Sequence, residues 1–95
     1  MITVVKIGGN VLDNEDLLKG FLKDFVDLPG HKVLIHGGGA LASRLQMALG
    51  IRPEMRDGRR VTGTETLRVV TMVYAGWCNK TIVASLQALG CDAVG

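Results

Sequence analysis

The chain has 95 residues, 47% of them hydrophobic, and a formal net charge of +2 at pH 7. A chain of this length forms at most one small domain, and its apolar content predicts a packed core rather than disorder. So small a net charge gives no sign of a nucleic-acid or membrane partner. No segment approaches the ~20 consecutive apolar residues of a membrane span.

The cysteines and the first residues indicate a cytoplasmic protein. Cys78 and Cys91 form no CxxC pattern and have no clustered histidines, so we expect neither a zinc site nor a disulfide. Two buried, reduced thiols fit a reducing compartment. The N-terminus has no basic segment followed by a long apolar run, which argues against a secretion signal.

The first half of the chain alternates strand and helix. Residues 2–8 are almost continuously apolar, which is typical of a parallel strand covered on both faces. Asp13 or Asn14 is expected to cap a helix that ends at Pro29-Gly30. The residues expected to face the core from this helix are Leu17, Leu18, Phe21, Leu22 and Phe25.

A second strand and a second helix follow. The strand is expected over residues 32–36, and the helix over 40–49, ending at Gly50. A right-handed crossover makes the two strands parallel, so that their carboxyl ends share one edge of the sheet. We therefore expect an α/β fold with an open, mainly parallel sheet sandwiched by helices. The residues expected on one stripe of the second helix are Leu41, Leu45 and Leu49.

Glycines follow both strands at the edge that the strands share. Gly8-Gly9 follows the first strand, with Lys6 beside it, and His36-Gly37-Gly38-Gly39 follows the second. Such glycines bring backbone N–H groups close to a ligand, and the N-terminus of the helix behind them favours negative charge. Ligands bind at this edge in open α/β sheets. The pattern predicts a site for phosphate and carboxylate groups.

Residues 51–63 break this alternation. Asp57-Gly58 is a strong hairpin-turn signal, and Pro53 argues for a hairpin at an edge rather than a central strand. The simplest interpretation of its arginines is a solvated surface. Arg60 directly precedes the next helix and is the candidate to clamp a carboxylate in two parallel hydrogen bonds. The four arginines are Arg52, Arg56, Arg59 and Arg60.

A long helix is predicted over residues 64–89, with a capping box formed by Thr62 and Glu65. It is apolar on most sides, from which we expect a homodimer interface in which helices cross; the alternative is a helix enclosed within a larger monomer. Gly76 in its interior lowers helix stability by about 1 kcal/mol unless something packs closely there. Residues 92–95 are expected to begin another strand. The main apolar stripe of the helix consists of Leu67, Val70, Tyr74, Trp77 and Leu86.

Two nucleotide-binding motifs need to be weighed. Residues 37–42 satisfy the GxGxxA pattern, and Asp57 follows Gly37 by twenty residues, which allows a dinucleotide-binding interpretation. It is weak, because the acidic residue should follow a buried parallel strand. A Walker loop is excluded, since residues 76–81 lack its second glycine and fall in the long helix.

Five motifs follow one another along the chain: Val4-Val5-Lys6-Ile7-Gly8-Gly9, Leu34-Ile35-His36-Gly37-Gly38-Gly39, Arg60-Val61-Thr62, Glu65-Thr66-Leu67 and Asn79-Lys80. In order and spacing they resemble the amino acid kinase family, over essentially all 95 residues. The Arg-Val-Thr segment and the Asn-Lys pair most resemble the members that act on an N-acylglutamate. The resemblance implies ATP-dependent phosphorylation of the side-chain carboxylate of N-acetyl-L-glutamate, or a related N-acylglutamate, in arginine biosynthesis. The products would be ADP and an acyl phosphate.

The resemblance also implies roles for individual residues. Lys6 resembles the catalytic lysine that stabilises the phosphoryl group in flight. Gly8 and Gly9 resemble the turn that faces this group, while Gly38 and Gly39 resemble the glycines that hold the acylated amino acid. ATP would bind as its Mg²⁺ complex, with no metal ligands expected from the protein.

Arg60 resembles the arginine that grips the carboxylate of the acylated amino acid. For His36 the sequence leaves two interpretations open, one in which it orients the turn and one in which it is a core histidine. Asn79 and Lys80 receive no chemical role. Gly63 departs from the family, since related sequences commonly have an acidic residue there.

The resemblance also bears on completeness, because family members are much longer and their second half supplies most of the nucleotide pocket. We expect residues 1–95 to form the acyl-amino-acid-binding part of a kinase domain, without the nucleotide-binding part and inactive alone. Two other functions stay open. One is a kinase of the same family for a homologous substrate such as aminoadipate, and the other is a non-catalytic, dimerising amino-acid-binding module.

Overall fold

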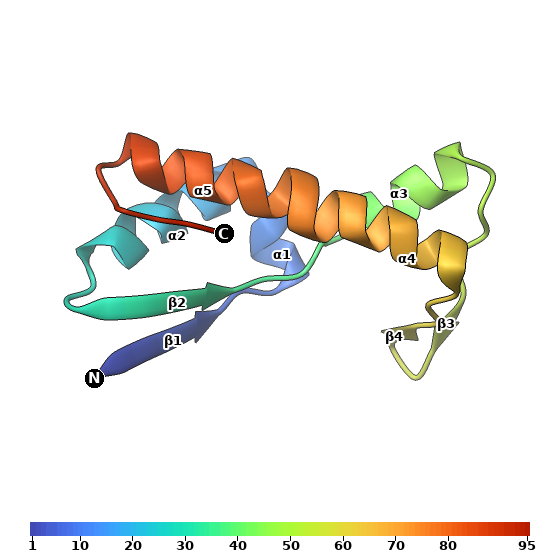
Figure 1. Cartoon of the computed structure of the whole chain (residues 1–95), viewed down its shortest axis with the longest axis horizontal. Coiled ribbons are helices and arrows are strands. Elements are labelled where there is room, and N and C mark those ends of the chain that lie inside the picture. Colours follow the sequence, from blue (N-terminus) through green and yellow to red (C-terminus); the bar gives the residue numbers. More distant parts are fainter.

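A small parallel sheet and a long helical rod set the plan of the molecule (Figure 1). The computed structural model describes residues 1–95 and measures 42 × 24 × 21 Å along its principal axes. The rod runs along the length of the molecule, with the sheet towards one end and a short hairpin at the other. The elements are β1 (Ile2–Lys6), α1 (Gly9–Leu12), α2 (Glu15–Asp27), β2 (His31–Ile35), α3 (Leu41–Ala48), β3 (Met55–Arg56), β4 (Arg59–Arg60), α4 (Thr64–Val70), the π-helix η1 (Thr71–Cys78) and α5 (Asn79–Ala88).

The parallel pairing expected for the first two strands is confirmed. β1 and β2 pair in parallel with Val4 opposite Val33, and the pairing continues to Lys6 opposite Ile35. Beyond the strands, the Ile7 amide donates to the Ile35 carbonyl over 3.0 Å. The carboxyl ends of both strands therefore lie side by side.

The expectation that the sheet is covered on both faces is wrong for this chain. The inward face contributes Ile7, with Val5 and Leu34 beside it, to a core shared with α2 and α5. The outward face carries Val4 and Val33, which are 59% and 46% exposed. The physical reason is that both helices that pack on the sheet cover the same face. The buried members of this core are Ile7, Leu22, Phe25, Ile82 and Leu86.

Asn14, and not Asp13, caps α2. The Asn14 side chain accepts hydrogen bonds of 3.1 Å from the amides of Asp16 and Leu17, as an N-cap residue does. Asp13 instead ends α1, a single helical turn that the sequence pattern did not predict. Of the predicted inward stripe, Leu22 and Phe25 are buried, whereas Leu17 is more than half exposed.

The helix predicted over 64–89 is confirmed as a continuous rod of α4, η1 and α5. Its middle is a π-helix rather than an α-helix, and nothing packs closely against Gly76 within it. The predicted capping box is wrong, because the N-cap is Gly63 and no side chain caps the helix. The hydroxyl of Thr62 bonds to the Arg60 carbonyl instead, over 3.3 Å.

The predicted stripe of the rod is also partly wrong. Leu67 and Trp77 point outwards, with exposed fractions of 55% and 67%, while Val69 and Val73 are buried. These two valines form a second core with Ala42 and Cys78. The predicted stripe of α3 is confirmed for Leu41 and Leu45, which pack against this core, and is wrong for Leu49, which is 56% exposed. The fully buried residues of α3 are Ala42 and Gln46.

The hairpin is confirmed, and the last predicted strand is wrong. β3 and β4 pair antiparallel around Asp57 and Gly58, whose φ angles are +51° and +75°. Asp57 is thus an exposed turn residue and does not follow a parallel strand, which removes the dinucleotide-binding interpretation. Residues 92–95 pair with no strand. None of the helices has both the length and the apolar character needed to cross a membrane.

Candidate functional site

The two glycine turns meet at the carboxyl ends of β1 and β2. A Cβ atom placed on Gly9 would lie 3.6 Å from the Cα of Gly39, which is ordinary van der Waals contact. The parallel register of the strands produces this contact, because it puts both turns at one edge. The structure therefore brings together the two segments in which the sequence predicted anion binding.

Asp13 joins these turns. Both of its carboxylate oxygens lie 3.1 Å from the amide nitrogen of Ala40, which donates to them. Ala40 is the N-cap of α3 and has no side chain that could cap the helix. Asp13, from a distant part of the chain, accepts from the backbone amide of this N-cap residue itself. Sequence reasoning considered Asp13 only as a cap for α2 and missed this role.

Gly38 and Gly39 are required by the protein's own packing. A Cβ on Gly38 would overlap the ring of Tyr74, and one on Gly39 would overlap the Asp13 carboxylate. Gly39 also has a φ of +57°, in the left-handed region that disfavours other residues. Their missing side chains therefore allow η1 and Asp13 to approach.

Gly8 and Gly37 are different. No atom lies within 4 Å of the position that a Cβ would take on either residue, and neither has a positive φ. Nothing in the fold therefore requires glycine at these positions. The open space in front of them is available to a ligand that approaches the backbone closely.

Lys6 is free to reach such a ligand. It is the last residue of β1, it is exposed, and its ammonium group makes no hydrogen bond or ion pair within the protein. The turn that begins two residues later is Gly8-Gly9. An exposed, unpartnered cation thus lies at the edge where the two turns meet.

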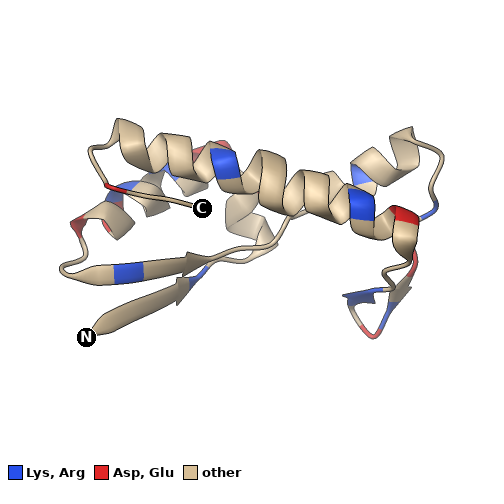
Figure 2. Cartoon of the chain, viewed as in Figure 1, with Lys and Arg blue, Asp and Glu red and all other residues tan.

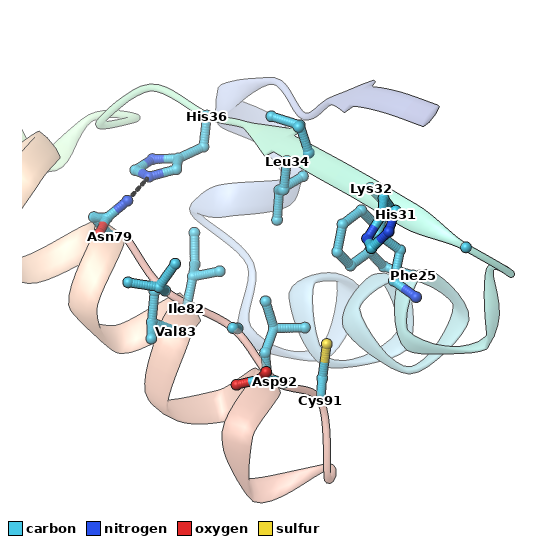
Figure 3. Close-up of a pocket in the computed structure, with 15 residues that line it drawn as sticks. Phe25, His31, Lys32, Leu34, His36, Asn79, Ile82, Val83, Cys91 and Asp92 are labelled. Carbon is cyan, nitrogen blue, oxygen red and sulfur yellow. Dashed lines mark hydrogen bonds between the residues drawn. The ribbon is translucent and has the colours of Figure 1, made fainter. Parts of the chain in front are cut away.

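His36 is held on both ring nitrogens. Its Nδ1 lies 2.7 Å from the Gly37 carbonyl oxygen, and its Nε2 lies 3.2 Å from the amide nitrogen of Asn79 (Figure 3). Lys80 donates to the other end of that amide, over 2.8 Å. Because a carbonyl can only accept, we assign the proton to Nδ1, and Nε2 then accepts from Asn79. This supports the interpretation in which His36 orients the turn.

Hydrogen bonds to two side chains of α3 hold the Arg60 guanidinium in place. Its Nη1 donates to Oε1 of Gln46 over 2.5 Å, and its Nη2 donates to the Ser43 hydroxyl over 3.0 Å. Gln46 is fully buried and donates in turn to the Thr66 hydroxyl on α4, over 3.0 Å. The buried Nε of Arg60 has no partner. Arg60 touches neither glycine turn directly. It is linked to the second glycine turn through α3, which begins directly after that turn.

Cys78 is a structural thiol beside this turn. It is buried, and its Sγ lies 4.0 Å from the carbonyl oxygen of Gly38. Burial raises the pKa of this thiol, and the negative charge of Asp13 raises it further. Cys78 therefore stays protonated at neutral pH and is a poor nucleophile.

A hollow of about 520 Å³ lies between β2 and α5, with His36 at its edge and none of the glycines of the two turns in its lining (Figure 3). Most of the side chains that line it are hydrophobic, among them Phe25, Leu34 and Ile82. Lys32 also lines it, but its ammonium already donates to the carbonyls of Val26 and Leu28. None of the residues predicted to bind phosphate or carboxylate lines this hollow.

Comparisons with known proteins agree with one another. A model of the amino acid kinase family matches residues 1–95. An acetylglutamate kinase from Cytophaga hutchinsonii is 52% identical over 92 residues, which cover 97% of this chain and 35% of that protein. One from Bacteroides thetaiotaomicron is 52% identical over 94 residues, covering 99% and 37%. The chain thus spans about a third of the length of the curated kinases it matches.

A solved structure shares the fold. It is that of N-acetylglutamate synthase from Neisseria gonorrhoeae, complexed with coenzyme A and L-arginine. The TM-score is 0.63 and the sequence identity 28%, over 99% of this chain and 22% of that one. The mixed α/β arrangement of parallel strands and helices is thereby found in an independent structure.

Alanine substitutions at Gly39 and Gly8 test whether the fold requires glycine at each position. We expect Gly39→Ala to lower the free energy of unfolding by about 1–2 kcal/mol or more, because a left-handed φ is strained for alanine and the new methyl group meets Asp13. Gly8→Ala should change it by less than about 0.5 kcal/mol, since the new methyl group meets open space. Urea denaturation measures both. Equal losses in the two variants would show that the Gly39–Asp13 contact does not constrain the fold.

Proposed function

This chain belongs to the amino acid kinase family, and from that premise we propose that the protein phosphorylates the side-chain carboxylate of N-acetyl-L-glutamate with ATP. The products are ADP and an acyl phosphate, and the reaction belongs to arginine biosynthesis. The observation that carries the proposal is the contact between the two glycine turns at one sheet edge, with the free Lys6 ammonium beside them. The curated relatives named acetylglutamate kinase support the same activity.

Phosphoryl transfer suits this arrangement because it needs positioning and charge stabilisation rather than a protein nucleophile. The acceptor carboxylate is already ionised at neutral pH and attacks the γ-phosphorus itself. Lys6 offsets the negative charge on the transferring group, and the backbone amides of Gly8 and Gly9 donate to its oxygens. Magnesium enters with ATP as part of the substrate complex and offsets the remaining phosphate charge.

The second glycine turn and Arg60 hold the acceptor in this proposal. The amides of Gly38 and Gly39 donate to the acylated amino acid, at the start of α3, where the helix dipole favours negative charge. Arg60 contacts the carboxylate that does not react. Gln46 and Ser43 occupy one N–H on each terminal nitrogen of Arg60, which leaves the second N–H on each free to donate.

Residues 1–95 form the acyl-amino-acid-binding part of the kinase domain in this proposal. The chain spans about a third of the relatives' length, and we expect it to be inactive alone, with the nucleotide pocket supplied by the region of the kinases that it does not match. Two unpaired thiols suit a cytoplasmic location.

The test is ADP release by the full-length protein. N-acetyl-L-glutamate should support release, and its homologue with one more methylene, N-acetyl-L-α-aminoadipate, should support at least about tenfold less, since one misplaced methylene is worth ~1–3 kcal/mol. The reverse preference would favour the aminoadipate-type kinase. ADP release with neither compound, despite binding of the acylated amino acid, would favour the non-catalytic module.

Lys6→Ala tests the assignment of the lysine. In the full-length protein we expect turnover to fall by about 10²–10³-fold, the loss seen when a donor to developing charge is removed. The fold should be unaffected, because the Lys6 side chain has no partner within the protein. The matched control is Lys19→Ala, an exposed lysine of α2, which should retain full turnover. Undiminished turnover in Lys6→Ala would overturn the assignment.

We also propose that the rod formed by α4, η1 and α5 packs against a second copy of the chain. Its outward face presents Leu67, Met72 and Trp77, each more than half exposed. Charge is sparse along this rod (Figure 2), with Arg68 and Lys80 as its only interior charges. An apolar face of this kind on a long helix is stable only when covered.

Trp77→Glu tests the dimer. A charge in the centre of the covered face should lower the mass measured by sedimentation from that of a dimer to that of a monomer. Leu17→Glu is the matched control, because Leu17 is a similarly exposed apolar residue on α2. If Trp77→Glu sediments like the unaltered protein, the exposed face of the rod is not the contact between copies.

A further inference from the structure

Asp13 makes the only side-chain hydrogen bonds between the segments that hold the two glycine turns. The hydrogen bonds that the Ala40 amide donates to the Asp13 carboxylate are the only ones that join residues 8–14 to residues 36–41. The carboxylate also lies against Gly39, where no side chain fits. Asp13 thus contacts the second turn at two consecutive residues.

The short helix α1 transmits this contact to the first turn. Asp13 is the C-terminal cap of α1, and its amide donates to the Gly9 carbonyl over 2.8 Å. The Leu12 amide donates to the Gly8 carbonyl over 3.2 Å. The carbonyls of Gly8 and Gly9 are therefore hydrogen-bonded within α1, and Asp13 at the end of α1 accepts from Ala40.

We infer that Asp13 is a positioning residue that fixes the distance between the turn facing the phosphoryl group and the turn holding the acylated amino acid. The inference rests on the proposed phosphoryl transfer. In such a reaction the attacking oxygen and the phosphorus belong to two substrates, and each substrate is held by one turn. A displacement of about 1 Å between them costs about 10²-fold in rate, so the residue that sets their separation controls turnover.

Asp13 does not act as a base in this scheme. The acceptor carboxylate carries no proton at neutral pH, so no group has to remove one. Both Asp13 oxygens are also engaged by the Ala40 amide. The negative charge of Asp13 has a structural effect, since a carboxylate at the N-terminus of α3 stabilises the helix by about 0.3–1 kcal/mol.

The experiment compares three variants of the full-length protein. Asp13→Ala removes the link, Asp13→Asn keeps an acceptor oxygen without the charge, and Asp16→Asn removes a charge from an exposed neighbour whose side chain has no partner. We expect kcat to fall by about 10²-fold in Asp13→Ala, with the KM for each substrate changed by less than about threefold. Asp13→Asn should recover most of the turnover, and Asp16→Asn should match the unaltered protein.

A second readout is independent of activity. The exchange rate of the Ala40 backbone amide, followed by NMR, should rise in Asp13→Ala and not in Asp16→Asn, because only the first loses the acceptor. Faster exchange together with unchanged kcat would overturn the positioning role. Unchanged exchange would overturn the link itself. If the unaltered protein phosphorylates neither acceptor, the proposed function fails, and the exchange result alone then decides whether Asp13 fixes the turns.

Discussion

The contact between the Asp13 carboxylate and the start of α3 is the constraint on which the rest of the site depends. Parallel pairing brings the carboxyl ends of β1 and β2 to one edge, but it fixes only the strands and not the turns beyond them. Asp13 extends that order by binding Ala40 and filling the space beside Gly39. The Asp13 carboxylate occupies the space that a side chain on Gly39 would fill. Any larger residue at position 39 would therefore displace the carboxylate.

The helical rod also contacts the second glycine turn. Tyr74 packs where a Cβ on Gly38 would be, Cys78 lies beside the Gly38 carbonyl, and Asn79 bonds to His36. Two of these residues belong to the π-helix η1 and the third directly follows it. A π-helical turn is wider than an α-helical one and often occurs at functional sites. Here the π-helix changes the register of the rod at the residues whose side chains contact the second glycine turn.

The sequence predicted the strand order, the meeting of the glycine turns, the hairpin and the extent of the rod, because apolar periodicity and turn residues carry those features. It failed where a residue's partner is distant in the chain. Asp13 resembles a helix cap by its position next to Asn14, and only the folded chain shows its bond to Ala40, 27 residues away. Gln46 is a second example: a glutamine on a helix is expected to face solvent, yet it is fully buried because Arg60 and Thr66 complete its hydrogen bonds. The outward face of β1 and β2 is exposed because α2 and α5 both pack on the other face of the sheet. Apolar periodicity does not determine on which face of a sheet each helix packs.

The most direct test of this account is to follow the backbone amides of the full-length protein by NMR as N-acetyl-L-glutamate and the ADP complex of Mg²⁺ are added together. A site built from both turns predicts that the signals of residues 8–9 and 37–40 shift together, since both turns then face the bound substrates. It also predicts that the hollow between β2 and α5, lined by Leu34 and Ile82, is left unchanged. Shifts confined to that hollow, or to one turn alone, would contradict a site built from two turns held in contact.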